Sequence, residues 1–175
     1  MKIRVATLSD IQAISEIHAT SWRKNYQNVL TKEYLIDKAS NERHQLWKGR
    51  FNNPKPNQQV LLAIVEGEIA GFVSLYASEN PHWGSYLDNL HVREKYHSKG
   101  IGKALLIAGA RWFYQQDSQN GMCLLVNQDN IKAQEFYKKL GARNVEASIW
   151  NAPDGSIVPT YWFVWDTLNN LIEAT

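Results

Sequence analysis

One stretch of the sequence, HVREKYHSKGIGKALLIAGARWF at residues 91–113, constrains the fold more than any other. It starts at the end of a predicted strand, crosses a basic loop, and enters an apolar repeat typical of a helix beside Gly100 and Gly102. In this order the first backbone amides of the helix point outward along the positive end of its dipole. Because neither glycine has a Cβ, an anion such as a pyrophosphate can approach the main chain closely.

The basic loop does not match the two best-known phosphate-binding motifs. A P-loop needs Ser or Thr directly after its Lys, whereas Ala104 follows Lys103 at the wrong spacing. The dinucleotide fingerprint needs a third Gly or Ala three residues after the second, where this chain has Leu105. The alternative to an anion site is that the glycines only cap a helix while the basic side chains form a solvated face.

The order of the predicted elements indicates an α+β fold. Two helices fill the first third of the chain, one capped by Ser9 or Asp10 and one over residues 31–50. The sequence then predicts strands at 59–65, 69–77, 84–92 and 122–127, helices at about 100–116 and 130–141, and a long hairpin around APDGS. We therefore expect one domain over residues 1–175, with a mixed central sheet of about seven strands flanked by helices.

Composition narrows the classes of function. The 19 Lys and Arg residues nearly balance the 17 Asp and Glu residues, so neither a nucleic acid nor a membrane surface is an expected partner. The single Cys123 lies in an apolar run, which favours a buried thiol in a reducing compartment. No apolar run reaches the roughly 18 residues of a membrane span, so we expect a cytoplasmic protein. The His and Cys residues show no ligand spacing, so we expect no metal.

The glycine loop resembles the cofactor loop of the GNAT superfamily of acetyl-CoA-dependent N-acetyltransferases. The family pattern is a strand of the type L-x-V, several polar residues, Gln or Arg, two residues, Gly, any residue, and Gly or Ala. This chain supplies Leu90, Val92, His97, Gly100 and Gly102. His97 replaces the usual Gln or Arg; because the family holds the pyrophosphate with loop amides, we expect His97 to be tolerated and to make cofactor affinity sensitive to pH.

A second motif of the same family follows about 30 residues later. It consists of a strand, an Asn, two residues, Ala, then Phe-Tyr, three residues and Gly, matched here by Asn130, Ala133, Phe136, Tyr137 and Gly141. The resemblance implies that Tyr137 is the general acid that protonates the departing CoA sulfur. The alternative is that Tyr137 only packs. Asn130 is a cofactor contact, a helix cap, or both.

The resemblance also implies acetyl-CoA as co-substrate. Its pantetheine arm is expected in a cleft where two central parallel strands splay apart, hydrogen-bonded to one strand as an added strand would be. The residues expected to contact the cofactor are Leu90, His91, Val92, His97, Ser98, Lys99, Gly100, Ile101, Gly102, Lys103, Asn130 and Tyr137.

The general base is less well defined. Many relatives carry a Glu four residues before the Leu that corresponds to Leu90, and this chain has Tyr86 there. Asp88 is expected on the same face of the strand and is the first choice for the base. Its alternative role is hydrogen bonding to loop amides. Reserve candidates are Glu79, His82 and His91, whereas His18 is expected to be an ordinary helix residue.

The segment AISEIHATSWRKNY resembles the first helices of one GNAT subgroup, which form part of the acceptor pocket. Aromatic side chains can bind an apolar or cationic amine. The residues expected to line that pocket are Trp22, Tyr26, Trp83, Tyr86 and Trp150. The predicted function is direct acetyl transfer, in a ternary complex, to a primary amine of a small molecule or peptide. The alternative is a non-catalytic acyl-CoA-binding sensor or scaffold.

The C-terminal strand PTYWFVWD, at residues 159–166, is rich in aromatic residues. If this strand lay at a sheet edge, leaving it uncovered would be unfavourable. A homodimer is therefore a further expectation.

Overall fold

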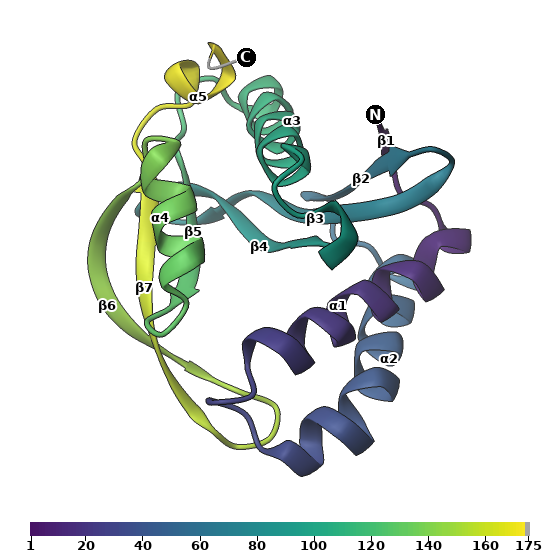
Figure 1. The fold of residues 1–175 in the computed structure, drawn as a ribbon. Helices are drawn as coiled ribbons and strands as arrows, with labels where there is room; N and C mark the ends of the chain where they lie inside the picture. The colour runs from purple at the N-terminus through teal and green to yellow at the C-terminus, as the bar shows by residue number, and fades with distance from the viewer. Residues whose placement is uncertain (174–175) are drawn as a thin grey trace.

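A computed structural model describes residues 1–173, and its centre is a seven-stranded sheet in the order β1-β2-β3-β4-β5-β7-β6 (Figure 1). The strands are β1 Lys2–Val5, β2 Gln58–Val65, β3 Glu68–Asn80, β4 Gly84–Val92, β5 Met122–Asn127, β6 Arg143–Asn151 and β7 Ile157–Trp165. The longer helices are α1 Ile11–Asn25, α2 Ala39–Asn52, α3 Ile101–Gln116, α4 Ile131–Lys139 and α5 Asn169–Glu173. The predicted α+β fold with a mixed seven-stranded sheet is confirmed.

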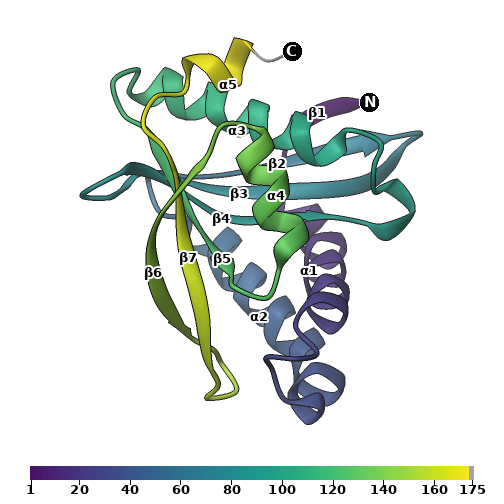
Figure 2. The same cartoon turned by 60° about the vertical axis from the view of Figure 1, so that its left-hand side comes forward.

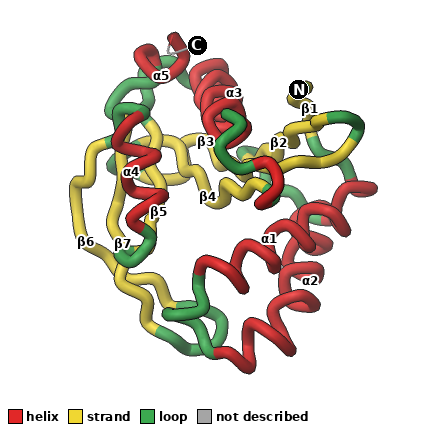
Figure 3. Tube along the Cα trace, viewed as in Figure 1, coloured by secondary structure: helices red, strands yellow, loops and turns green. Residues whose placement is uncertain are grey.

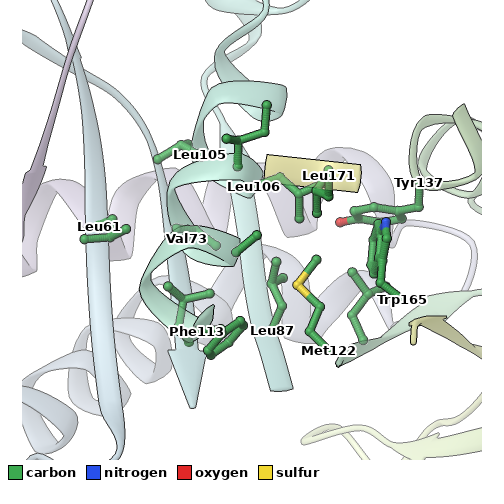
Figure 4. Packing of buried hydrophobic residues seen from close by; sticks show 14 of the residues in the cluster. Leu61, Val73, Leu87, Leu105, Leu106, Phe113, Met122, Tyr137, Trp165 and Leu171 are labelled. Carbon is green, nitrogen blue, oxygen red and sulfur yellow. The ribbon is translucent and has the colours of Figure 1, made fainter. Parts of the chain in front are cut away.

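Helices cover both faces of the sheet (Figure 3). The alternation of side chains along β3 accounts for the two layers. Phe72 packs in a cluster with Trp47 of α2, whereas its neighbour Val73 packs in the opposite cluster with Leu105 of α3. Side chains of α4 and α5 join the second cluster, which Figure 4 shows in detail. The sheet is thus the middle of three layers.

The helix predicted over residues 31–50 is partly wrong. Residues Tyr34–Lys38 form a π-helical turn, and the α-helix runs from Ala39 to Asn52. A π turn holds more residues than an α turn and so rotates the helix that follows it. With this rotation Tyr34, Ala39 and Trp47 are all buried.

The two central strands pair over a very short length. β4 and β5 are parallel, and their register contains only Ser85 with Met122 and Tyr86 with Cys123. Beyond these pairs the strands separate, as Figure 2 shows. The remaining backbone of β4 on the β5 side therefore has no strand partner, which is the splay expected between the central strands.

The expectation that residues 159–166 form a sheet edge is wrong. β7 lies between β5 and β6 and pairs antiparallel with both, so its backbone is paired on both sides. Of its aromatic side chains, Phe163 and Trp165 are buried, and Tyr161 and Trp162 are half-buried. The edge strand on this side of the sheet is β6, and all of its side chains are exposed or half-buried. Strand order cannot be read from local sequence, because both arms of the hairpin are rich in β-forming residues. The argument for a homodimer loses its basis with this correction.

The hairpin of β6 and β7 reaches across to the segment between α1 and α2 (Figures 1 and 2). The backbone N–H of Thr31 donates to Asp154 Oδ2 at 2.7 Å. Apolar side chains of the hairpin also pack against those of the helices. The buried members of this cluster are Trp22, Leu30, Tyr34, Leu35, Ala39, Ala152 and Val158. The two ends of the sheet are thus connected through the helices as well as through β4 and β5.

Cys123 has no disulfide partner and is fully buried, as predicted, and burial raises the pKa of its thiol to about 12. No helix within residues 1–173 is long and apolar enough to cross a membrane.

Candidate active site

A cavity of about 780 Å³ lies where β4 and β5 separate. Its volume is within the range of sites that hold a cofactor or drug-sized ligand. The predicted residues that line it are Trp22, Tyr26, Tyr86, Asp88, Leu90, His91, Val92, His97, Ser98, Gly100, Ile101, Gly102, Lys103, Asn130, Tyr137 and Trp150. One cavity therefore brings together residues from the glycine loop, β4, α4, α1 and the C-terminal hairpin.

Two predicted residues lie outside this cavity. Lys99 is exposed, and its Nζ lies 5.4 Å from the centroid of the Tyr96 ring. Trp83 lines a separate cavity of about 410 Å³ near the turn of β3 and β4, and its ring lies 5.1 Å from that of Trp162. The assignment of Trp83 to the acceptor pocket is not supported by its position.

The backbone of the glycine loop has the form expected of an anion site. Gly100 caps α3 with φ of +77°, a left-handed conformation that favours glycine, and Ser98 has φ of +61°. Within the described part of the chain, the N–H groups of residues 98–100 donate to no protein group. The first three amides of α3, at residues 101–103, have no helical partner by position. A Cβ on Gly100 would enter open space, so an anion can come close to the main chain here.

His97 and Asn130 hold the loop and α4 in place. His97 Nε2 lies 2.9 Å from the carbonyl oxygen of Val92 and donates to it, which ties the loop to the end of β4. Asn130 Oδ1 accepts from the backbone N–H of Ala133 at 3.1 Å, so Asn130 is the helix cap predicted for it. Both residues also line the cavity.

Tyr137 lies between the cavity and the core. Its ring packs edge-on against Trp165 (Figure 4), with ring centroids 5.9 Å apart. The centroid of the Phe163 ring lies 6.3 Å from that of Tyr137. Burial raises the pKa of Tyr137, and a nearby Tyr26 raises it further. The phenol therefore stays protonated at neutral pH and can donate a proton. No residue within 1–173 accepts a hydrogen bond from its hydroxyl, which leaves the hydroxyl available to a ligand.

A β-bulge at Asp88 decides how β4 presents its side chains. Asn89 and Leu87 pair with consecutive residues of β3, 74 and 75, so Asp88 is an extra residue in the ladder. The bulge reverses the alternation along the strand, and Leu87 and Leu90 consequently pack in the same cluster although three positions separate them. The extra residue also leaves backbone polar groups of β4 without a ladder partner beside the cavity.

The Asp88 carboxylate is held by neighbouring groups. Arg50 Nη1 donates to its Oδ2 at 2.7 Å, and the Asn89 side-chain amide also donates to Oδ2. Among the described residues, none donates to Oδ1. Burial and the negative charge of Asp88 raise the pKa of Tyr86, so Tyr86 is a neutral phenol and not a base. Of the two, Asp88 is the residue that can accept a proton.

The other base candidates differ in position. Glu79 accepts from Lys55 Nζ at 2.7 Å and from the Asn57 side chain, and it lies outside the cavity. His82 lines the smaller cavity with Trp83. His91 lines the main cavity, but burial and the charge of Arg43 lower its pKa to about 4, which makes it a weak base.

The cavity has an aromatic wall on its α1 side. The Trp22 ring lies 5.6 Å from that of Tyr26 and 5.5 Å from that of Trp150. Trp22 and Tyr26 are four residues apart in and after α1, so they lie on one face of the helix. In the sequence, the signal for them was their aromatic character and the resemblance of AISEIHATSWRKNY to the first helices of a GNAT subgroup.

Sequence reasoning took His18 for an ordinary helix residue and did not single out Arg43, yet both belong to this wall. His18 is one turn before Trp22, and Arg43 is one turn before Trp47 on α2. Both line the cavity and both are buried. Their helical spacing from a tryptophan was visible, but that spacing is equally typical of ordinary core and surface positions. Within residues 1–173, no cluster of three or more His, Cys, Asp or Glu side chains is placed to hold a metal ion.

Known proteins resemble this chain in sequence and fold. YuaI of Bacillus subtilis, named an uncharacterized N-acetyltransferase, is 28% identical over 130 residues, which are 73% of this chain and 72% of YuaI. The spermidine N(1)-acetyltransferase of Thermoplasma acidophilum is 24% identical over 145 residues, 81% of this chain and 87% of that protein. The crystal structure of the PaiA N-acetyltransferase of Thermoplasma acidophilum with coenzyme A has a TM-score of 0.68 at 18% identity, covering 91% of this chain and 98% of that chain.

The model of the acetyltransferase (GNAT) family matches residues 11–142, which include both motifs and most of the cavity lining. With this match and the sheet topology, the chain belongs to the GNAT family of acetyltransferases.

Proposed function

We propose that this acetyltransferase transfers the acetyl group of acetyl-CoA to a primary amine by direct attack in a ternary complex. The observation that carries the proposal is the continuity of the cavity. The same space reaches the free amides of the glycine loop, the neutral phenol of Tyr137 and the aromatic wall of α1. A cofactor and an acceptor bound at its two ends would meet beside β4.

The residues present fit coenzyme A. The six amides of residues 98–103 offer donors for a pyrophosphate at the positive end of the α3 dipole, and Lys103 adds a charge. The unpaired side of β4 from Leu90 to Val92 offers backbone donors and acceptors to an extended amide-containing chain. Acetyl-CoA brings a reactive thioester carbonyl to this site.

Three groups of the chain would carry the chemistry. Asp88 accepts the proton of the incoming ammonium at Oδ1, because Oδ2 is held by Arg50. The unpaired backbone at the bulge stabilises negative charge on the carbonyl oxygen by donating a hydrogen bond. Tyr137 donates its phenolic proton to the departing sulfur. The second proton lost by the attacking nitrogen, released through solvent, restores the phenol.

Calorimetric titration with acetyl-CoA tests the cofactor site, with NAD and ATP as controls. We expect acetyl-CoA alone to bind tightly, and binding of NAD or ATP in preference would contradict the assignment of the glycine loop. A screen of primary amines for CoA release then tests transfer. If acetyl-CoA binds tightly but no amine causes release of CoA, the result would instead support a non-catalytic acyl-CoA sensor.

A further inference from the structure

Arg43 is a buried cation in the wall of the acceptor side. It is 7% exposed, and its guanidinium carbon lies 4.2 Å from the centroid of the Trp22 ring. Its Nη2 donates to Glu42 at 3.2 Å, and its buried Nε has no hydrogen-bond partner within residues 1–173. A buried guanidinium with unmet donors is unfavourable, so the arrangement points to a ligand that completes it.

His18 is a second unmet donor in the same wall. The Trp47 indole N–H donates to His18 Nδ1 at 3.1 Å, which places the ring proton of the neutral imidazole on Nε2. Burial lowers the pKa of His18 well below its usual value, so the ring is neutral at pH 7. His18 Nε2 is buried and has no partner among the described residues. An acceptor atom is therefore missing beside Arg43.

Arg43 and Arg50 differ in where their carboxylate partners lie. Arg50 is compensated by Asp88 at 2.7 Å, and both line the cavity. Arg43 also lines it, but its one carboxylate partner, Glu42, is 41% exposed in its side chain and does not line it. Glu42 thus pairs with Arg43 from outside the cavity, and no carboxylate that lines the described cavity pairs with Arg43. A polyamine would be repelled by the charge of Arg43, whereas an anionic group would be attracted.

We propose that the acceptor is a primary amine that also carries a carboxylate, and that Arg43, with His18 beside it, binds that carboxylate. The proposal rests on the proposed amine acetylation. A planar guanidinium binds a carboxylate with two parallel hydrogen bonds, which fixes the orientation of the molecule as well as its position. The aromatic wall of Trp22, Tyr26 and Trp150 then accommodates an apolar side chain of the acceptor.

The test compares amines that differ only in the carboxylate. The pairs are L-tryptophan and tryptamine, L-phenylalanine and phenethylamine, L-lysine and cadaverine, and L-arginine and agmatine, with spermidine as a reference. For the wild-type enzyme we expect kcat/KM from CoA release to favour the carboxylate member of at least one pair by about tenfold or more. Equal or greater kcat/KM for every decarboxylated member, or for spermidine, would overturn the proposal while leaving amine acetylation established.

Substitution of Arg43 tests whether this residue causes the preference for the carboxylate-bearing amine. Arg43→Gln is expected to raise KM for the carboxylate member by about 10- to 100-fold. It should not raise KM of the decarboxylated partner, and it should lower that KM where the guanidinium charge repels the amine. Acetyl-CoA affinity and thermal unfolding show whether the variant is folded. Arg111→Gln, on the exposed side of α3, is the matched control and should change neither KM. A preference that survives Arg43→Gln unchanged would overturn the role of Arg43.

A binding measurement separates this proposal from the reaction. The wild-type protein saturated with coenzyme A is titrated calorimetrically with each member of the pairs, and no turnover is needed. Tighter binding of the carboxylate member supports the proposal even if no amine is acetylated, in which case the proposed function alone fails. Absence of any preference in binding overturns the proposal.

Discussion

The imidazole rings of His18 and His91 stack beside the cavity, with their centroids 4.8 Å apart and an angle of 30° between their planes. His91 also shares a hydrogen bond of 2.8 Å with the hydroxyl of Ser21. Burial is the main cause that lowers the pKa of each ring, and the charge of Arg43 lowers both further. The pair is therefore neutral in the folded protein at physiological pH.

This pair predicts a loss of stability in mild acid. The pKa of His91 is about 4 in the folded protein and 6.5 in the unfolded chain, so between these values only the unfolded chain binds the proton. The stability is complete above pH 6.5 and falls by about 3 kcal/mol as the pH drops to 4. His91→Gln should remove much of this fall in urea unfolding at pH 7.5 and 4.5. The exposed His82→Gln is the control, and equal pH slopes in all three proteins would contradict the assignment.

Tyr137→Phe should slow acetyl transfer by roughly 10- to 10,000-fold, because the departing sulfur loses its proton donor. The packing of the ring on Trp165 is kept, so the free energy of unfolding and the affinity for acetyl-CoA should stay close to those of the wild type. The half-exposed Tyr114→Phe serves as the control. A fully active Tyr137→Phe enzyme would restrict Tyr137 to packing.

Asp88→Asn should lower turnover by about 100-fold near neutral pH, with recovery at high pH where the acceptor amine loses its proton to solvent. Steady-state rates across the pH range measure this effect, and the affinity for acetyl-CoA should hold. Glu79→Gln removes another ion-paired carboxylate outside the cavity and should leave the profile unchanged. If Asp88→Asn keeps the wild-type pH profile, Asp88 is not the base.

Gly100→Ala should weaken both the fold and the cofactor site. The positive φ of +77° is strained for alanine by about 1 kcal/mol, and the new Cβ points into the space expected for the pyrophosphate. Acetyl-CoA affinity should fall by about tenfold. Gly155→Ala has the same kind of strain, with φ of +86° and open space around the Cβ, at the tip of the β6–β7 hairpin. Gly155→Ala should lower the free energy of unfolding without changing the affinity for acetyl-CoA. An equal loss of affinity in both variants would contradict the assignment of the pyrophosphate site to the loop at Gly100.

Local sequence predicted the elements and the loop, because periodicity, caps and turn residues act over a few residues. The motif around Gly100 and the strand-to-helix units could be placed for this reason. The bulge at Asp88 could not, because one extra residue in a ladder depends on the pairing with β3 and not on the residue itself. Nothing in the local sequence distinguished Trp83 from the other aromatic residues. Its position just before β4 places it in a different cavity.

The charged part of the acceptor wall was also invisible to sequence reasoning. Arg43 and His18 belong to two helices whose relative position is set by packing on the sheet, and their unmet donors exist only in the folded protein. The two family motifs contain the glycine loop and Tyr137, so local sequence was enough to single them out. The wall that holds Arg43 and His18 is assembled from the first helices and the last hairpin, which only the folded chain brings together.

Because only two residue pairs join β4 to β5, the width of the cavity depends on the angle between these two strands. Strands rise about 3.3 Å per residue, so Val92 lies about 20 Å from the junction at Tyr86. A rotation of about three degrees around that junction displaces such a strand end by about 1 Å, comparable to the difference between a hydrogen bond and a lost contact. The bond from Thr31 to Asp154 and the contact of Trp22 with Trp150 oppose this rotation from the far side. The width of the cavity is thus restrained by the surface where the β6–β7 hairpin rests on α1 and on the segment after it.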